Sequence, residues 1–313
     1  MAGWPPGAAS RSVDLDVPVH LTEYGDPTGA HPILCLHGLG ASALNFGALG
    51  PLLAGDRRVV VPDLLGHGRS PASPPEEGAV EAQLRMLERL VEAECGGSVT
   101  LVGHSMGGIL ALLHALRSPT TVDRLVLLDP PVPNPTSWPR DPRLTAKLAL
   151  LRLPGMGGLV ARQALAVTPE QYVDRQLASA TPHVDRIPVE AVRATVAETR
   201  ATREVGGGRA AQRDQFRAIV DVVALLARPA AWRRQLAGIT APVLWLQGED
   251  DLLARASDAR VLAGALPGWD FRTRAGIGHL PHLEDPEWTA ATITGWLTGT
   301  HPRPEDAARS PLP

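Results

Sequence analysis

The sequence predicts an α/β fold, a mostly parallel sheet flanked by helices with an inserted helical cap. Short apolar runs alternate with longer segments of helical periodicity, as in parallel strands joined by crossover helices. This alternation stops at a cluster of prolines after Asp129 and resumes at Val243. Because the intervening segment is helical in pattern and lacks strand runs, we expect it to be an insertion into one domain.

Six segments predict the parallel strands. Five are short, continuous and apolar, as expected of strands covered on both faces, and a sixth precedes the last helix: Ile33–Leu36, Val59–Val61, Thr100–Val102, Leu125–Leu128, Val243–Leu246 and Asp270–Arg274. Near the N-terminus, the weaker runs Val13–Val19 and Leu21–Tyr24 predict an antiparallel hairpin at the edge of the sheet.

Four segments predict the helices around the sheet. Ala79–Glu94 has leucines at helical spacing and charges on its other face, so one side is expected to pack on the sheet. Met106–Leu116 is almost wholly apolar and is expected to be buried. Ser257–Leu266 and Glu287–Leu297 follow the last strands.

We expect residues 1–133 and 236–313 to form the core domain and residues 134–235 to form a cap over the carboxyl ends of the strands. The cap segment has fifteen Arg and one Lys against nine Asp and Glu, a net charge of +7, which leaves −10 for the rest of a chain with net charge −3. A solvated helical surface explains this excess. The alternative is attraction of an anionic substrate or an acidic carrier partner.

Composition excludes several classes of protein. With 313 residues, 44% hydrophobic and 20% charged, the chain has the profile of a globular protein, and its net charge does not indicate nucleic-acid binding. It has no apolar run long enough to span a membrane and no N-terminal secretory signal, so we expect a cytoplasmic protein. Cys35 and Cys95 are too few for a disulfide scaffold, and no spacing predicts a metal or cofactor site.

The segment from Thr100 to Gly108 contains the motif G-x-S-x-G between a predicted strand and a predicted helix. This context predicts a sharp turn that presents the hydroxyl of Ser105 as a nucleophile. Gly103 and Gly107 lack Cβ atoms, so the strand and the helix can approach closely. The helix that begins at Met106 would place its amides and its positive dipole end beside the reacting oxygen.

A serine hydroxyl needs a base, and the loop after Asp270–Arg274 supplies a candidate in His279. His282, three residues further on, is the competitor, with a loop or pocket-lining position as the other interpretation. The base in turn needs an acid that holds its tautomer. Asp251, just past the strand Val243–Leu246, is our first choice.

Asp250 and Asp129 remain alternatives for the acid. Asp250 adjoins Asp251, and Asp129 directly follows the strand Leu125–Leu128. For Asp129, a turn or cap carboxylate at the strand end is the competing interpretation. The resulting order of serine, aspartate and histidine along the chain is typical of one fold.

With these motifs, nearly all of the chain outside the insertion resembles the α/β-hydrolase superfamily. The matching segments are the elbow around Ser105, the oxyanion loop Leu36–Gly40, the D-x-x-G-x-G-x-S segment Asp63–Ser70, and Gly278-His279 followed by Glu284-Asp285-Pro286. The resemblance implies the α/β-hydrolase fold and a catalytic triad. It also implies an oxyanion hole made by the backbone N–H groups of Leu39 and Met106. His37 and His67 would be structural, and His104 a neighbour of the nucleophile.

The resemblance leads us to expect hydrolysis of a carboxylic ester through an acyl-enzyme on Ser105, without a cofactor. Serine rather than aspartate at the elbow argues against the haloalkane dehalogenase and epoxide hydrolase branches. A C–C bond hydrolase, a thioesterase or a lactonase would use the same residues, and a ligand receptor would use only the fold. We expect a small, largely apolar ester or acyl substrate, contacted by Trp138, Met156 and His282.

Overall fold

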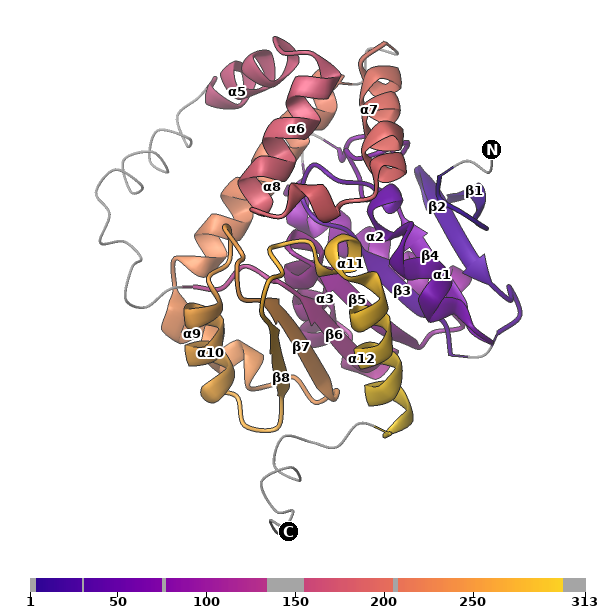
Figure 1. Ribbon diagram of the computed structural model, residues 1–313, viewed down its shortest axis with the longest axis vertical. Helices are drawn as coiled ribbons and strands as arrows, with labels where there is room; N and C mark the ends of the chain where they lie inside the picture. Colours follow the sequence, from indigo (N-terminus) through magenta and orange to yellow (C-terminus); the bar gives the residue numbers. More distant parts are fainter. Residues whose placement is uncertain (1–3, 30, 75–76, 134–154, 205–207, 301–313) are drawn as a thin grey trace.

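The computed structural model (Figure 1) describes residues 4–29, 31–74, 77–133, 155–204 and 208–300. Its centre is one eight-stranded sheet in the order β1-β2-β4-β3-β5-β6-β7-β8. β1 and β2 form an antiparallel hairpin, β2 pairs antiparallel with β4, and all later neighbours are parallel. The predicted, mostly parallel sheet flanked by helices is therefore confirmed.

The strands follow the apolar runs of the sequence closely. Their bounds are β1 (Ala9–Asp14), β2 (Pro18–Gly25), β3 (Ile33–Leu36), β4 (Arg58–Pro62), β5 (Val99–His104), β6 (Val122–Leu128), β7 (Val243–Gly248) and β8 (Asp270–Arg274). The prediction of one strand over Val13–Val19 was wrong, because the hairpin turns within it. Asp16 has a φ of 70°, and the Leu15 N–H donates to Val17 O across the turn.

Helices cover both faces of the sheet, with α12 in front and α3 behind in the view of Figure 1. Alternate strand residues separate two cores: Ile33 and Cys35 of β3 pack in the core with α1 and α12, whereas Leu34 and Leu36 pack in the core with α2 and α3. The helices of this domain are α1 (Leu49–Ala54), α2 (Ala79–Glu94), α3 (Met106–Arg117), α10 (Ala256–Gly264), α11 (Pro281–Glu284) and α12 (Pro286–Thr298), with short 3₁₀ turns at Ala43–Phe46 and Pro119–Thr121.

Between β6 and β7, the described residues form helices and no strand. These are α5 (Met156–Leu165), α6 (Pro169–Ala180), a 3₁₀ turn at Val184–Arg186, α7 (Val189–Glu204), α8 (Gly208–Leu226) and α9 (Pro229–Leu236). α5, α6 and α7 lie together at one end of the sheet (Figure 1), whereas Leu226 of α8 and Trp232 of α9 are buried in the core beside α2 and α3. The division at residues 134 and 235 remains a prediction.

The turn from β5 into α3 depends on two glycines that touch neighbouring backbone. A Cβ added to Gly103 would lie 2.5 Å from Gly107 O, and one added to Gly107 would lie 2.2 Å from Leu36 O. Real Cβ atoms do not approach backbone this closely, so any side chain at either position must displace β3 or the turn. The two glycines therefore set the distance between the elbow and the loop that follows β3.

Replacing Gly107 by alanine is expected to lower the free energy of unfolding by about 3 kcal/mol, because overpacking against rigid backbone costs up to roughly this amount. Thermal unfolding of the purified variant measures the effect. Gly264→Ala is the matched control: it is also helical, nothing lies within 4 Å of its added Cβ, and we expect its Tm to stay near that of wild type. Equal Tm values for both variants would contradict the close approach at the elbow.

Candidate active site

Ser105 stands at the junction of β5 and α3 in a strained backbone conformation. Its φ of 51° and ψ of −120° lie where residues with a Cβ are rarely found. Its own N–H donates to Leu128 O on β6, which ties the turn to the neighbouring strand. Ser105 lines a cavity whose other walls include residues of α6 and α7.

Three distant segments meet at this hydroxyl through a continuous chain of hydrogen bonds. His279 Nε2 lies 2.9 Å from Ser105 Oγ, and His279 Nδ1 lies 2.8 Å from Asp251 Oδ2. The backbone N–H groups of Leu253 and Ala254 donate to Asp251 Oδ1 at 2.7 and 2.8 Å, which fixes the carboxylate. Since His279 and Asp251 are only 3% and 6% exposed, water competes little with these bonds.

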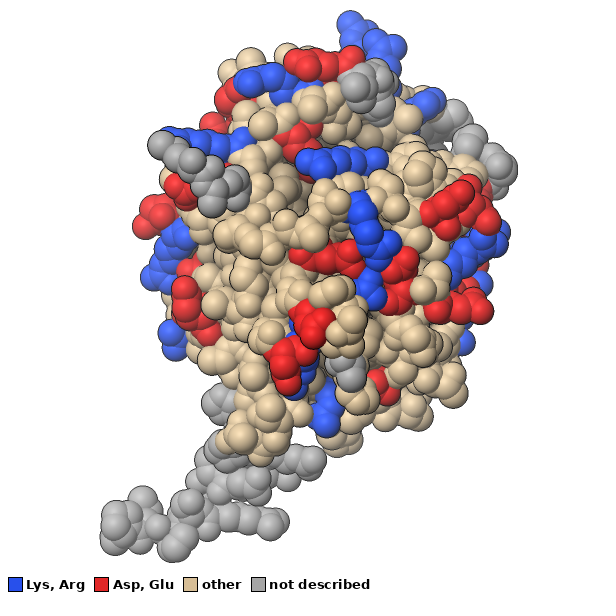
Figure 2. Space-filling model, turned by 90° about the vertical axis from the view of Figure 1, so that its right-hand side faces the viewer, with Lys and Arg blue, Asp and Glu red and all other residues tan. Residues whose placement is uncertain are grey.

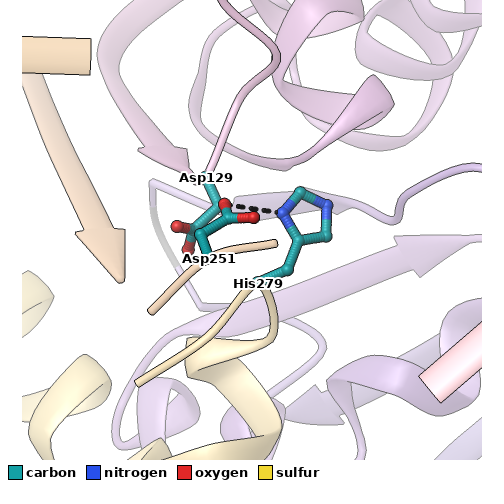
Figure 3. A group of neighbouring side chains, drawn as sticks. All are labelled: Asp129, Asp251 and His279. Atoms are coloured by element: carbon teal, nitrogen blue, oxygen red, sulfur yellow. Dashed lines mark hydrogen bonds and ion pairs between the residues drawn. The ribbon is translucent and has the colours of Figure 1, made fainter. Parts of the chain in front are cut away.

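The two alternative acids occupy different positions. Asp250 turns outward, and its Oδ2 lies 2.8 Å from Nε2 of His183, which belongs to the cap segment. Asp129 is fully buried next to Asp251 (Figure 3) and has no hydrogen bond to His279. Among these three carboxylates, Asp251 is the one bonded to the imidazole.

The structure does not bring His282 to the cavity, contrary to its predicted role in substrate binding. Pro281–Glu284 forms a helical turn that points His282 inward, where it is 0% exposed and stacks on Phe46 with ring centroids 5.1 Å apart. Burial lowers the pKa of His282 to about 3, so the ring is neutral. A loop position and a buried turn give the same sequence pattern here, and packing decides between them.

Three further histidines, His37, His67 and His104, contact the backbone around the site. His37 Nε2 accepts the Leu64 N–H at 3.0 Å, and Nδ1 of His67 lies 3.0 Å from Leu65 O. His104 Nε2 donates to the carbonyl of His279 at 2.7 Å, so the residue next to Ser105 holds the loop that carries His279. Burial is the main cause that lowers the pKa of His104 well below its ordinary value.

The oxyanion role of Leu39 and Met106 remains a prediction, and the structure gives the position of each residue. Leu39 lines the cavity together with Ser105, in the loop Gly38–Ala41 that follows β3. Met106 is the first residue of α3, so its amide N–H has no acceptor within the helix. Asp63 connects two nearby loop segments, because its Oδ1 accepts the Ala43 N–H at 2.8 Å and its Oδ2 accepts the Arg69 N–H at 2.9 Å.

The cavity above Ser105 has a volume of about 300 Å³ and a largely apolar wall. Its sides come from the loop after β3, from α6 and α7 and from α11. The apolar side chains that line it are Leu39, Ala41, Val173, Leu177, Ala180, Ile187, Ala191, Val192, Leu253, Leu280 and Leu283. Of the other two predicted substrate contacts, Trp138 and the side chain of Met156 lie outside the described residues.

Two buried polar residues contact the site, and the sequence did not indicate a role for either of them. Glu284 accepts the N–H groups of Gly278 and Leu280 at 2.7 and 2.9 Å, and so clamps the loop on both sides of His279. Gln247 Nε2 lies 2.9 Å from Asp251 Oδ2 and 2.6 Å from the neighbouring Asp129 Oδ1. A polar residue inside the otherwise apolar run of β7 was the signal that could have identified Gln247.

Charges on one face of the molecule are mixed. On the face shown in Figure 2, basic and acidic side chains are interspersed rather than gathered by sign. Two arginines of α7 form local bonds, Arg203 with the Val167 carbonyl and Arg200 with Glu170. Within the described residues, no helix combines the length and the apolar character needed to cross a bilayer.

Comparisons with known proteins agree with this architecture. The mouse sn-1-specific diacylglycerol lipase ABHD11 is 28% identical over 85% of this chain and 80% of its own length. Among solved structures, Cfl2 from Burkholderia cenocepacia has a TM-score of 0.72 at 25% identity over 94% of this chain and 97% of that one. A putative lipase from Acinetobacter baumannii has a TM-score of 0.70 at 24% identity over 94% and 92%. Since the model of the alpha/beta hydrolase fold family matches residues 31–286, the chain belongs to that family.

Proposed function

We propose that this protein hydrolyses carboxylic esters with an apolar acyl group, through an acyl-enzyme formed on Ser105. The observation that carries the proposal is the hydrogen-bond chain from Asp251 through His279 to Ser105, which ends at an apolar cavity. A nucleophile, a base and an orienting acid in bond distance form the arrangement that acyl transfer requires.

In the first half of the reaction, His279 Nε2 takes the proton of Ser105 Oγ as that oxygen attacks the ester carbonyl carbon. The Asp251 carboxylate keeps the proton of Nδ1 in place and stabilises the imidazolium that forms. The amides of Leu39 and Met106 would donate to the carbonyl oxygen as it becomes negative. The imidazolium then protonates the alcohol oxygen, the bond from carbon to that oxygen breaks, and the acyl group remains on Ser105.

In the second half, His279 takes a proton from a water molecule that attacks the acyl carbon. The tetrahedral intermediate collapses, the imidazolium returns the proton to Ser105 Oγ, and the carboxylic acid leaves. The sum is one ester and one water converted into one acid and one alcohol, with the enzyme restored. Each group returns to its starting protonation state, so these steps need no cofactor.

The cavity favours esters of short or medium-length apolar acids. Its volume of about 300 Å³ is at the small end of the range for small-molecule sites. Its wall of aliphatic side chains would gain free energy by covering acyl methylene groups. The names of the lipase relatives point to the same class of bond.

A fluorophosphonate probe and a substrate panel test the proposal. We expect rapid labelling of one site, identified by peptide mass spectrometry as Ser105, and turnover of p-nitrophenyl butyrate and hexanoate. No labelling and no turnover would favour a ligand receptor. Faster turnover of acyl-CoA thioesters, with strong inhibition by salt, would favour a thioesterase whose basic cap attracts its substrate. A β-diketone substrate tests for a C–C bond hydrolase and a lactone tests for a lactonase.

Acyl-chain preference is expected to depend on Ala191, which is buried and lines the cavity from α7. In Ala191→Leu, the larger side chain should shorten the longest p-nitrophenyl ester that is hydrolysed efficiently, with a drop of about tenfold or more in kcat/KM, since a misfit of one or two methylenes costs 1–3 kcal/mol. Ala197→Leu, at an exposed position of the same helix, is the matched control. An unchanged chain-length profile in Ala191→Leu would show that the acyl group lies elsewhere.

A further inference from the structure

Asp129 is a second carboxyl group beside the proposed acid, and the mechanism above does not use it. It directly follows β6, has a φ of 46° and is 0% exposed. Its Oδ1 accepts the Gly248 N–H at 2.8 Å and the Gln247 side-chain amide at 2.6 Å. Its Oδ2 is buried and has no hydrogen-bond partner among the described residues, which is rare for a polar atom inside a protein.

The missing partner of Oδ2 is explained by the closeness of Asp251. One ligand atom from each of Asp129, Asp251 and His279 lies within 4.8 Å of the others, and Figure 3 shows the two carboxyl groups side by side. Asp129 and Asp251 are 0% and 6% exposed, so two negative charges this close would repel each other strongly, and ionisation of both groups is disfavoured. We therefore expect one of the two to hold a proton.

The hydrogen bonds decide which group keeps the charge. Four donors reach Asp251: the N–H groups of Leu253 and Ala254 on Oδ1, and the His279 ring and the Gln247 amide on Oδ2. Within the described part of the chain, two donors reach Asp129, both on Oδ1, so a proton on its Oδ2 displaces neither of them. Asp251, the carboxylate that accepts more hydrogen bonds, stays ionised, and the proton lies on the free Oδ2 of Asp129.

We infer that Asp129 is a neutral, protonated positioning residue whose Oδ2–H donates a hydrogen bond to the Asp251 carboxylate. This bond adds a fifth donor to the acid that faces His279 and joins β6 to the loop after β7. Asp129 does not line the cavity, so it acts through Asp251 and not on the substrate. The role in catalysis rests on the proposed function, whereas the protonation state does not.

The groups around Asp129 are consistent with this protonation. Asp251 and Glu284 are the acids that act on it, and both disfavour a second negative charge. Burial is the main cause that raises the pKa of Asp129 well above its ordinary range, and the Asp251 charge adds to it. His279 uses Nδ1 for its bond to Asp251, so that donor is not available to Asp129.

Infrared difference spectroscopy of wild type against Asp129→Asn at pH 8 tests the protonation state without any substrate. We expect the C=O band of a protonated carboxyl group in wild type and its absence in the variant. Asp123→Asn, at an exposed position of the same strand, is the control and should keep the band. Only carboxylate bands in wild type at this pH would overturn the proposal.

Kinetics separate a hydrogen-bond donor from a charge. In Asp129→Asn, the amide can replace both the O–H and the acceptor, so kcat/KM for p-nitrophenyl butyrate should stay within about threefold of wild type. In Asp129→Leu, kcat should fall by about tenfold or more with KM unchanged, because only the positioning of Asp251 is lost. A large loss of kcat in Asp129→Asn would mean that the negative charge of Asp129 is needed, which contradicts the inference.

Stability gives a second substrate-free readout. A raised pKa in the folded state means that folding takes up a proton above about pH 4, so this group's contribution to stability is lost as pH rises toward the folded pKa. Asparagine removes this loss. The Tm difference between Asp129→Asn and wild type should therefore move in favour of the variant from pH 5 to pH 8. A difference that does not change with pH would overturn the proposal, even if the protein hydrolysed no ester.

Discussion

Alanine in place of Ser105 is expected to lower kcat for p-nitrophenyl butyrate by about 10⁶-fold, as the loss of the nucleophile does in other serine hydrolases. Without Ser105 Oγ no acyl-enzyme can form, and His279 can only assist a direct attack by water. KM should change little, because the aliphatic wall of the cavity binds the acyl group. Steady-state assays over a range of p-nitrophenyl butyrate concentrations, on one enzyme preparation, measure kcat and KM.

Ser179 provides the matched control, since it also lines the cavity. Its hydroxyl donates to the Gln176 carbonyl of its own helix and has no hydrogen bond to His279. Ser179→Ala should keep kcat within a few fold of wild type and should still be labelled by the fluorophosphonate. If Ser105→Ala hydrolysed esters at the wild-type rate, or if the probe labelled another residue, the acyl-enzyme mechanism would be wrong.

The sequence was most informative where a local pattern of residues is compatible with one kind of local structure. Short, continuous apolar runs are typical of strands covered on both faces, so the central strands were located and the bounds of β3 were exact, whereas β6 begins three residues before the predicted Leu125. The turn around Ser105 needs glycine on both sides, which is why a short motif could place it. At the edge hairpin, alternation continued through the turn at Asp16, and the boundaries there were wrong.

The sequence could not predict the directions and partners of several side chains, because tertiary contacts determine them. Asp250 and Asp251 are adjacent, and the direction of each side chain separates a surface pair with His183 from a buried pair with His279. His282 has a loop-like sequence context, yet a helical turn buries it. The hydrogen bond between Asp129 and Gln247 joins the end of β6 to β7, and no spacing pattern along the chain could predict it.

The two adjacent aspartates allow a second large effect to be measured against a near-identical control. In Asp251→Asn, kcat should fall by about 10³- to 10⁴-fold, because an amide does not hold the imidazole in the tautomer that accepts the serine proton. In Asp250→Asn, kcat should stay within about twofold, since that carboxylate is 43% exposed and bonds only a surface histidine. Both substitutions remove one negative charge from the same loop, so long-range electrostatics cannot account for a difference.

The Asp251 substitution also bears on the neighbouring carboxyl group. Once the charge of Asp251 is gone, one cause of the raised pKa of Asp129 is removed, and the protonated-carboxyl band expected in wild type should weaken. The double variant Asp251→Asn/Asp129→Asn should then be slower than Asp251→Asn, because neither aspartate is left beside the His279 ring. Equal rates for Asp250→Asn and Asp251→Asn would remove Asp251 from the mechanism. Equal rates for the single and double variants would show that Asp129 cannot serve the imidazole when Asp251 is absent.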